Sequence, residues 1–202
     1  MTSLAAFMEL VNARRGHFRL ESGHHSGLWL DLDPLFINTR RIEPFVSALA
    51  GAVRPHGVDA VCGPMQGGAF LAQLVAAAMG IDFYFTERAR DDAGSGLFGA
   101  RYSLPPALAN RVRGARVAMV DDVMSAGSAL RGTFAALQSA GAQPVVAGAL
   151  LVLGTTGADY FVERGLPVEA VARDEFPHWT PAVCPLCRDD VAIEDLASAP
   201  PP

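Results

Sequence analysis

The stretch VAMVDDVMSAGSALRG, residues 117–132, contains an apolar run that stops at two adjacent aspartates, Asp121 and Asp122. Small residues follow, and then a segment with helical spacing. A buried strand, a tight loop and a helix in this order form the repeating unit of an open parallel sheet. Ligands of such sheets bind beyond the carboxyl ends of the strands. The stretch therefore predicts that both carboxylates lie at a binding site.

The loop after the aspartates suits a phosphate group. Its small residues let an anion approach the backbone N–H groups at the start of the next helix, where the helix dipole also favours negative charge. Two carboxylates would repel a phosphate unless they face sugar hydroxyls or hydrated Mg²⁺. The alternative is an ordinary strand-to-helix turn in which Asp122 caps a backbone group. The pattern favours a ribose-phosphate site whose loop comprises Ser125, Ala126, Gly127, Ser128 and Ala129.

The rest of the chain repeats this order of strand, loop and helix. Apolar runs predict strands at 58–63, 81–87, 116–120, 144–153 and 168–172, and helical spacing predicts helices at 68–80, 129–141 and 158–164. Before them we expect a helix at 3–14, extended segments at 17–36 that include a strand at 28–33, and a helix at 44–54. Strands that alternate with helices are joined by right-handed crossovers. The sequence therefore predicts an α/β protein with a mostly parallel sheet.

The composition excludes several classes of function. The chain has 202 residues, which suits one domain, and half of them are hydrophobic. Its formal net charge of −5 offers no basic surface for nucleic acid, and all 16 basic residues are arginines. No apolar run reaches the roughly 20 residues of a membrane span, and three cysteines do not make a disulfide framework. We expect a cytoplasmic protein that binds neither nucleic acid nor a membrane.

The segment VAMVDDVMSAGSA resembles the phosphoribosyl pyrophosphate (PRPP) motif of type I phosphoribosyltransferases, and its loop is most similar to that of the orotate branch. Other segments resemble the same family in the expected order. They are FRLESGHHSGLWLDL (18–32) for the hood over the base, VCGPMQGGAFLA (61–72) for the pyrophosphate loop, YFTERAR (84–90) for the strand before the mobile catalytic loop, and FPHWTPAVCPLCRDD (176–190) for a carboxyl-terminal tail. The resemblance implies one phosphoribosyltransferase domain over 1–202. Its Rossmann-like core would span about 43–173, and its small hood about 1–42 with 174–196.

The resemblance also implies a reaction. PRPP binds with Mg²⁺, its phosphoribosyl group passes to a nitrogen base, with orotate expected, and the enzyme is a homodimer. The implied catalytic residues are Asp121, Asp122, Arg88 and Arg90, with both aspartates holding the ribose hydroxyls directly or through Mg²⁺. The loop at 125–129 would hold the 5-phosphate, and the implied pyrophosphate contacts are Met65, Gln66, Gly67 and Gly68. The implied base contacts are Ser22, His24, His25 and Trp29.

The sequence departs from the family pattern around the leaving group and the base. The family's mobile loop carries lysines and a histidine, whereas the loop here, RARDDAGSGLFGARYSL, has only arginines as cations. Many orotate enzymes have a lysine at the position of Glu21 and an Asp-Arg pair after the strand that here ends in LLVLGTTG. Two alternatives therefore stay open, a non-catalytic protein that binds PRPP or a nucleotide, and a phosphoribosyltransferase for another base.

Three smaller features also allow two interpretations each. His24 or His25 can contact the base, or can be a turn histidine bonded to the backbone. Trp29 can stack on a base or pack in the core. Cys184 and Cys187 have the spacing of half a zinc site, with His178 as a third ligand, or form a packed reduced pair or a redox staple.

Overall fold

The computed structural model describes residues 2–20, 23–88 and 101–195. Its main sheet has six strands in the order β5-β4-β3-β6-β7-β8. These strands are β3 (Ala60–Pro64), β4 (Asp82–Arg88), β5 (Tyr102–Ser103), β6 (Arg116–Met124), β7 (Gln143–Leu153) and β8 (Val168–Asp174). All of them pair in parallel except β5, which runs antiparallel to β4 at the edge. The prediction of an α/β fold with a mostly parallel sheet is confirmed.

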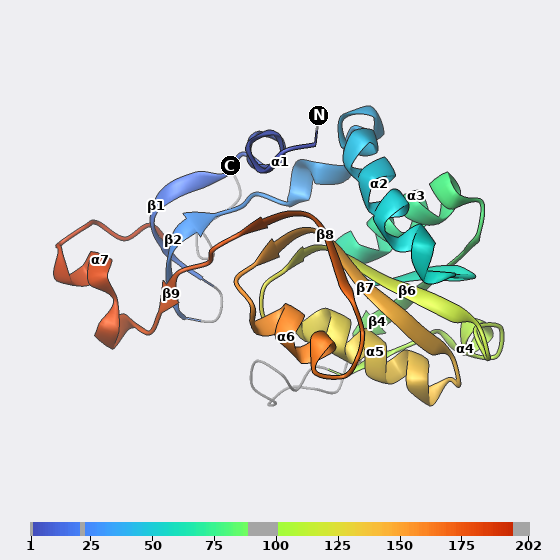
Figure 1. Ribbon diagram of the computed structural model, residues 1–202. Helices are drawn as coiled ribbons and strands as arrows, with labels where there is room; N and C mark the ends of the chain where they lie inside the picture. Colours follow the sequence, from blue (N-terminus) through green and yellow to red (C-terminus); the bar gives the residue numbers. More distant parts are fainter. Residues whose placement is uncertain (1, 21–22, 89–100, 196–202) are drawn as a thin grey trace.

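Helices cover both faces of this sheet (Figure 1). On one face lie α2 (Thr39–Val53) and α3 (Gly67–Met79), and on the other lie α5 (Ser128–Ser139) and α6 (Thr156–Val162), with the short α4 (Pro106–Ala109) beside them. Alternate residues of β6 supply the two sides of the core. Ala118 and Val120 pack in the cluster under α2 and α3, and Val117 and Met119 pack in the cluster under α5 and α6. The apolar run is therefore buried on both faces, as expected for a central parallel strand.

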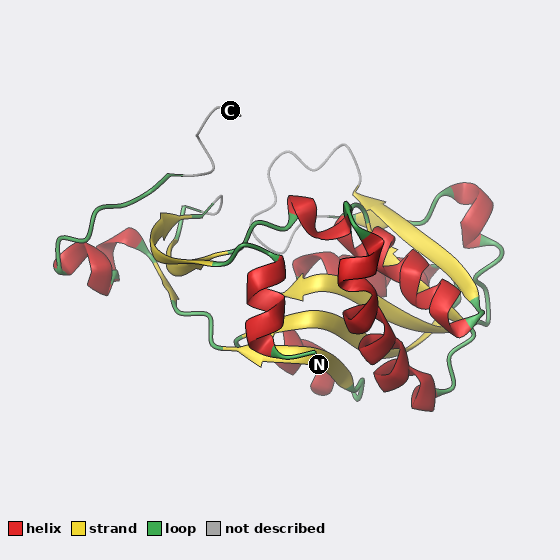
Figure 2. Ribbon diagram, turned by 90° about the horizontal axis from the view of Figure 1, so that it is seen from above, coloured by secondary structure: helices red, strands yellow, loops and turns green. Residues whose placement is uncertain are grey.

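A second, smaller sheet stands at one end of the molecule (Figure 2). It consists of β1 (Arg14–Arg19), β2 (His25–Trp29) and β9 (His178–Trp179), which pair antiparallel in that order. The chain after β9 forms a 3-10 helix, η3 (Pro181–Val183), and the short α7 (Pro185–Arg188). The amino-terminal α1 (Leu4–Leu10) packs its Phe7 ring against Phe45 of α2. We call the three-stranded sheet with α7 the hood.

Three expectations for the amino-terminal part were wrong. The helix expected at 3–14 ends at Leu10, because Asn12 takes a left-handed conformation with φ +45°, and β1 begins at Arg14. The strand expected at 28–33 is β2, which lies earlier, because its pairing with β1 and β9 begins at His25. A 3-10 helix, η1 (Asp33–Phe36), follows, with Pro34 in its first turn. The helix expected at 44–54 begins at Thr39, because the Asn38 side chain accepts a hydrogen bond from the Arg40 N–H at 3.1 Å and caps it. Another 3-10 helix, η2 (Arg54–His56), follows α2.

No helix in residues 2–20, 23–88 and 101–195 combines the length and the apolar character needed to cross a membrane.

Candidate active site

The two aspartates lie near the carboxyl end of β6, where the strand still pairs with β7. Both side chains are half-buried. The Asp121 carboxylate accepts a hydrogen bond from the Asp122 N–H at 3.1 Å, and the Asp122 carboxylate accepts one from the Val123 N–H at 2.7 Å. In the part of the chain that the structure describes, neither carboxylate takes part in a salt bridge. The pair therefore presents negative charge that no described side chain neutralises.

Burial changes the acidity of this pair. It raises the pKa of Asp121 well above its usual value, and the charge of Asp122 raises it further. Burial also raises the pKa of Asp122, although its hydrogen bond from the Val123 N–H opposes that rise. Two like charges in a site of reduced hydration repel each other. A bound cation or a set of donor hydroxyls would relieve this repulsion.

The start of α3 lies directly against the aspartates. A Cβ atom at Gly67 would overlap the Asp122 carboxylate, and one at Gly68 would lie 2.7 Å from Oδ1 of Asp121. Only residues without a side chain permit this approach. The preceding Met65–Gln66 peptide bond is cis, and the Met65 N–H donates to the Thr86 carbonyl at 2.8 Å. The segment predicted to hold pyrophosphate thus meets the predicted acid pair.

The loop at 125–127 forms the third side of the site. Gly127 has φ +72° and precedes α5, so the chain turns into the helix through a left-handed conformation that favours glycine. The Gly157 N–H at the start of α6 donates to the Ser125 carbonyl at 2.9 Å. A Cβ at Gly157 would lie 2.5 Å from that oxygen, so the loop can pack this closely against α6 only because residue 157 is a glycine. Ser128 and Ala129 begin α5, and the N–H groups of this turn are suited to an anion.

A buried hydrogen bond fixes α5 on the sheet. The hydroxyls of Thr86 in β4 and Thr133 in α5 lie 2.7 Å apart, and neither residue is exposed. Because α5 starts at the loop and β4 borders β3, this bond holds the loop and the pyrophosphate segment at a fixed separation. Neither threonine was expected from the sequence to matter for the site.

The cations predicted for catalysis are only partly described. Arg88 ends β4, is exposed and pairs in register with Tyr102 of β5. Arg90 lies outside the described residues. Burial raises the pKa of Tyr102, the charge of Asp121 raises it further, and Arg88 lowers it. Tyr102 is therefore within electrostatic reach of both an acid and a cation of the site, which sequence analysis missed.

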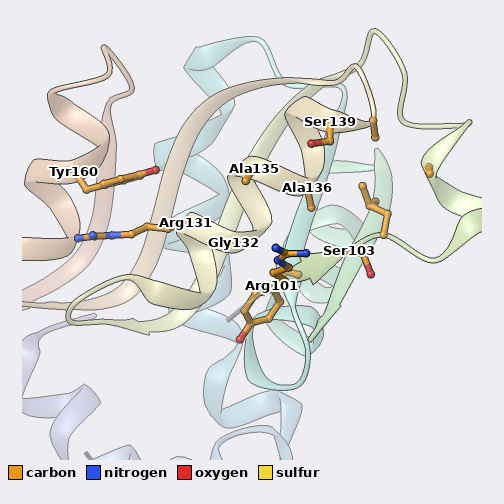
Figure 3. A pocket seen from close by; sticks show the side chains of 12 residues that line it. Arg101, Ser103, Arg131, Gly132, Ala135, Ala136, Ser139 and Tyr160 are labelled. Atoms are coloured by element: carbon orange, nitrogen blue, oxygen red, sulfur yellow. The ribbon is translucent and has the colours of Figure 1, made fainter. Parts of the chain in front are cut away.

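A cavity lies beside the site rather than in it. Its volume is about 650 Å³, and it lies between β5 and the outer side of α5 (Figure 3). At one end the Arg131 guanidinium stacks on the Tyr160 ring at 4.2 Å and donates to the Thr156 carbonyl at 2.9 Å. Arg101 and Ser103 also line the cavity. Neither aspartate and no residue of the loop at 125–129 lines this cavity.

The residues predicted to contact the base lie in the hood, except Ser22, which is outside the described residues. Trp29 is half-buried, and its ring centroid lies 6.2 Å from that of Phe18. The His24 ring lies 5.8 Å from that of His178. His25 is buried, and its Nδ1 lies 3.0 Å from Nε2 of His17. Their role toward a base stays a prediction.

The zinc alternative for Cys184 and Cys187 named the wrong histidine as third ligand. His178 is exposed, and its Nδ1 lies 3.0 Å from the Phe176 carbonyl. The histidines that lie beside Cys184 and Cys187 are His17 and His25. The register of the hairpin, which pairs Arg19 with His25, brings these two rings together. A predicted hairpin register would have been the signal that found His17.

Comparisons with known proteins agree with this geometry. A model of the phosphoribosyl transferase domain matches residues 46–183. The chain is 31% identical to an orotate phosphoribosyltransferase from Thermus thermophilus over 181 residues, covering 90% of this chain and 92% of the relative. It is 27% identical to one from Caldanaerobacter subterraneus over 190 residues, covering 94% and 93%.

Solved structures show the same fold at lower identity. The crystal structure of an orotate phosphoribosyltransferase from Aeropyrum pernix superposes with a TM-score of 0.68 at 22% identity, covering 84% of this chain and 93% of that one. An adenine phosphoribosyltransferase from Trypanosoma brucei gives a TM-score of 0.61 at 14% identity, covering 83% and 79%. These structures establish the fold alone. The domain match over most of the chain and the 31% identity to a full-length relative show that this protein belongs to the phosphoribosyltransferase family.

Proposed function

We propose that the protein is an orotate phosphoribosyltransferase, which transfers the 5-phosphoribosyl group of PRPP to a ring nitrogen of orotate and releases pyrophosphate. One observation supports the transfer above all others, namely the close approach of Gly67 and Gly68 to Asp122 and Asp121. It joins a loop suited to pyrophosphate with an acid pair suited to ribose hydroxyls. The choice of orotate rests on the names of the curated relatives.

Each part of PRPP has a complementary surface in this proposal. Asp121 and Asp122 accept hydrogen bonds from the ribose hydroxyls. The N–H groups of the loop at 125–129 hold the 5-phosphate, helped by the positive end of the α5 dipole. The backbone of 65–68 at the start of α3 faces the pyrophosphate, and Arg88 offers it a guanidinium fork.

The reaction then depends on placement and charge. The base nitrogen forms a bond to C1 of the ribose, the bond from C1 to the pyrophosphate oxygen breaks, and its electron pair leaves with pyrophosphate. The proton of the attacking nitrogen passes to water. Positive charge develops on the ribose ring during this step, and the carboxylates of Asp121 and Asp122 lie beside the place proposed for the ribose. Such positioning and electrostatic stabilisation account for most of the rate in transfers of this kind.

The acid pair also fits Mg²⁺, which we propose as the cofactor. Carboxylate oxygens are the hard donors that Mg²⁺ prefers, and those of Asp121 and Asp122 have no cationic partner among the described residues. When bound, Mg²⁺ neutralises charge on the pyrophosphate. The two residues would hold it directly or through water. A homodimeric assembly and a cytoplasmic location stay predictions.

One observation favours a second candidate, a base without a carboxylate. Orotate carries a carboxylate, and a buried carboxylate without a cation is costly. After β7 the chain continues as Gly154 and Thr155, neither of which is charged, and the Gly154 N–H donates to the Asp174 carbonyl at 2.9 Å. This segment offers orotate no guanidinium.

The test is pyrophosphate release from PRPP and Mg²⁺ in the presence of one base at a time. Orotate and uracil form the matched pair, because they differ only in the carboxylate, and adenine and guanine complete the panel. Release with orotate but not uracil supports the proposal. Pyrophosphate release with a different base alone would make that base, and not orotate, the substrate. PRPP binding measured by calorimetry without pyrophosphate release with any base would favour a non-catalytic PRPP-binding protein.

A further inference from the structure

Four potential metal ligands meet inside the hood, away from the acid pair. They are His17 of β1, His25 of β2, and Cys184 and Cys187 at the two ends of the first turn of α7. One ligand atom from each lies within 4.8 Å of every other. His17, His25 and Cys184 are buried, and Cys187 is exposed. We call these four residues the hood cluster.

The distances within the hood cluster suit one small ion at its centre. Nε2 of His17 lies 3.0 Å from Nδ1 of His25. Sγ of Cys187 lies 3.2 Å from Nδ1 of His25 and 3.7 Å from Nε2 of His17, and Sγ of Cys184 lies 3.5 Å from the same Nε2. A tetrahedral zinc site with Zn–N of about 2.0–2.1 Å and Zn–S of about 2.3 Å places its ligand atoms about 3.3–3.8 Å apart. The four distances lie in that range or up to 0.3 Å below it, so small shifts of the side chains would complete such a tetrahedron.

We propose that the hood cluster binds one Zn²⁺ ion as a structural Cys₂His₂ site. The donor set selects zinc over Mg²⁺ or Ca²⁺, because it contains two thiols and two imidazoles and no carboxylate. Four protein ligands complete a tetrahedron and leave no position for substrate, which is typical of structural zinc sites and not of catalytic ones. The ion would therefore take no part in phosphoribosyl transfer.

A contact outside the cluster supports the assignment. Nδ1 of His17 lies 2.8 Å from the Val191 carbonyl. A carbonyl only accepts hydrogen bonds, so Nδ1 carries the proton and Nε2 keeps its lone pair toward the cluster. Ligating histidines characteristically use their second nitrogen in this way, which fixes both the ring orientation and the tautomer.

The position of the site indicates what the ion would do. It would join the hairpin of β1 and β2 to α7, which is distant from the hairpin in the sequence. The described segment at 181–195 is mostly exposed, with Val183 69% and Ile193 44% exposed, so little apolar burial holds it in place. Its other contacts with the hairpin include the Glu194 N–H bonded to the His17 carbonyl at 2.8 Å, the Arg19 N–H bonded to the Glu194 carbonyl at 3.0 Å, and the salt bridges Arg14–Glu194 and Arg19–Asp195. A zinc ion would attach this segment firmly to the hairpin.

The first experiment measures metal in the reduced full-length protein. The protein is stripped with a chelator, reloaded with one metal at a time, and analysed for zinc by mass spectrometry and for cobalt by absorption. We expect one zinc per chain. Co²⁺ should give thiolate charge-transfer bands and the intense visible bands of tetrahedral coordination. X-ray absorption of the zinc-loaded wild type should show two sulfur and two nitrogen neighbours.

Matched variants identify the ligands. Cys187→Ser and His17→Gln should weaken zinc binding by more than the roughly 10–100-fold that loss of an outer contact typically costs. His178→Gln, an exposed histidine of the same hood, should leave zinc binding unchanged. Because the absorption measurements use the wild type, they remain decisive if a ligand variant does not fold.

Several results would overturn the proposal. One is a folded, reduced wild type that binds no zinc. Another is a zinc spectrum without sulfur neighbours. A third is equal weakening by His178→Gln and His17→Gln. A fourth is a Cys184–Cys187 disulfide in protein isolated without oxidant, which would show that the two cysteines form a redox-sensitive bond instead of binding a metal. None of these outcomes depends on whether the protein transfers a phosphoribosyl group.

Discussion

Gly67 lies so close to Asp122 that a single methyl group on the glycine would overlap the aspartate carboxylate. The two residues belong to different strand-to-helix connections, one after β3 and one at the end of β6. Their approach fixes the distance between the segment proposed for pyrophosphate and the segment proposed for ribose. The close approach of Asp122 therefore requires a glycine at position 67. The backbone conformation does not, because Gly67 does not have a positive φ.

Gly67→Ala should reduce both stability and PRPP binding. The added methyl must displace the Asp122 carboxylate or the start of α3, and forcing an extra group into a packed site costs about 1–3 kcal/mol. The measurements are urea unfolding and PRPP calorimetry. Gly51→Ala is the control, because Gly51 lies within α2 and has open space around it. That change should stabilise the protein by about 0.5–1 kcal/mol, and equal behaviour of the two variants would refute the steric explanation.

Asp122→Asn should separate stability from ligand binding. The amide keeps an oxygen to accept from the Val123 N–H, and it removes one of two neighbouring half-buried charges. We expect a higher melting temperature without ligand and at least about a tenfold loss of PRPP affinity, the equivalent of about 1.4 kcal/mol. Asp82→Asn, at the start of β4, serves as the control for a general change of charge. Unchanged PRPP affinity in Asp122→Asn would remove this residue from the site.

Thr133→Val should destabilise the fold without touching a ligand directly. It leaves the buried Thr86 hydroxyl without its partner at 2.7 Å, and an unsatisfied buried polar group costs about 1–3 kcal/mol. The double variant Thr86→Val with Thr133→Val removes both hydroxyls and should recover part of that loss. Urea unfolding of the four proteins forms a double-mutant cycle. If the double variant loses the sum of the two single effects, the hydrogen bond is not what holds α5.

Removal of zinc should loosen the carboxyl-terminal segment selectively. Limited proteolysis with and without chelator should show faster cleavage within 180–195 in the stripped protein, while the main sheet stays protected. The physical reason is that this segment is mostly exposed, and its other contacts with the hairpin are hydrogen bonds and salt bridges near its end, at 191–195. Cys187→Ser should show the fast pattern in both conditions, and His178→Gln should behave as wild type. Equal cleavage of the wild type with and without chelator would contradict a structural role for the ion.

The sequence predicted the central strands β3, β6 and β7 well because they are apolar on both faces, whereas the short edge strand β5 was not predicted. Val117, Ala118, Met119 and Val120 are all buried, so the run itself marks the strand. The place of the acid pair near the carboxyl end of β6 was also predictable, since two charged residues end the apolar run, although β6 itself continues to Met124. The approach of Gly67 to Asp122 was not, because it depends on how two connections lie in space.

The hood was harder to predict for a different reason. β2 is short, and its position is set by pairing with β1 and with β9, which is about 150 residues away in the chain. Alternation in LWLDLD suggested a strand at 28–33, but no partner strand continues past Trp29. His17 and His25 become neighbours of the cysteines only through these pairings. Local patterns carry no information about contacts of that range.

The composition of the hood sets the order in which the protein can fold during synthesis. All strands of the main sheet are complete once residue 174 has emerged from the ribosome. The hairpin of β1 and β2 precedes the main sheet in the chain, yet it waits for β9 and α7, which follow the main sheet. The hood therefore cannot close before residue 188 has emerged. A chain that stops near residue 176 would keep every strand of the main sheet and leave the hairpin without its third strand.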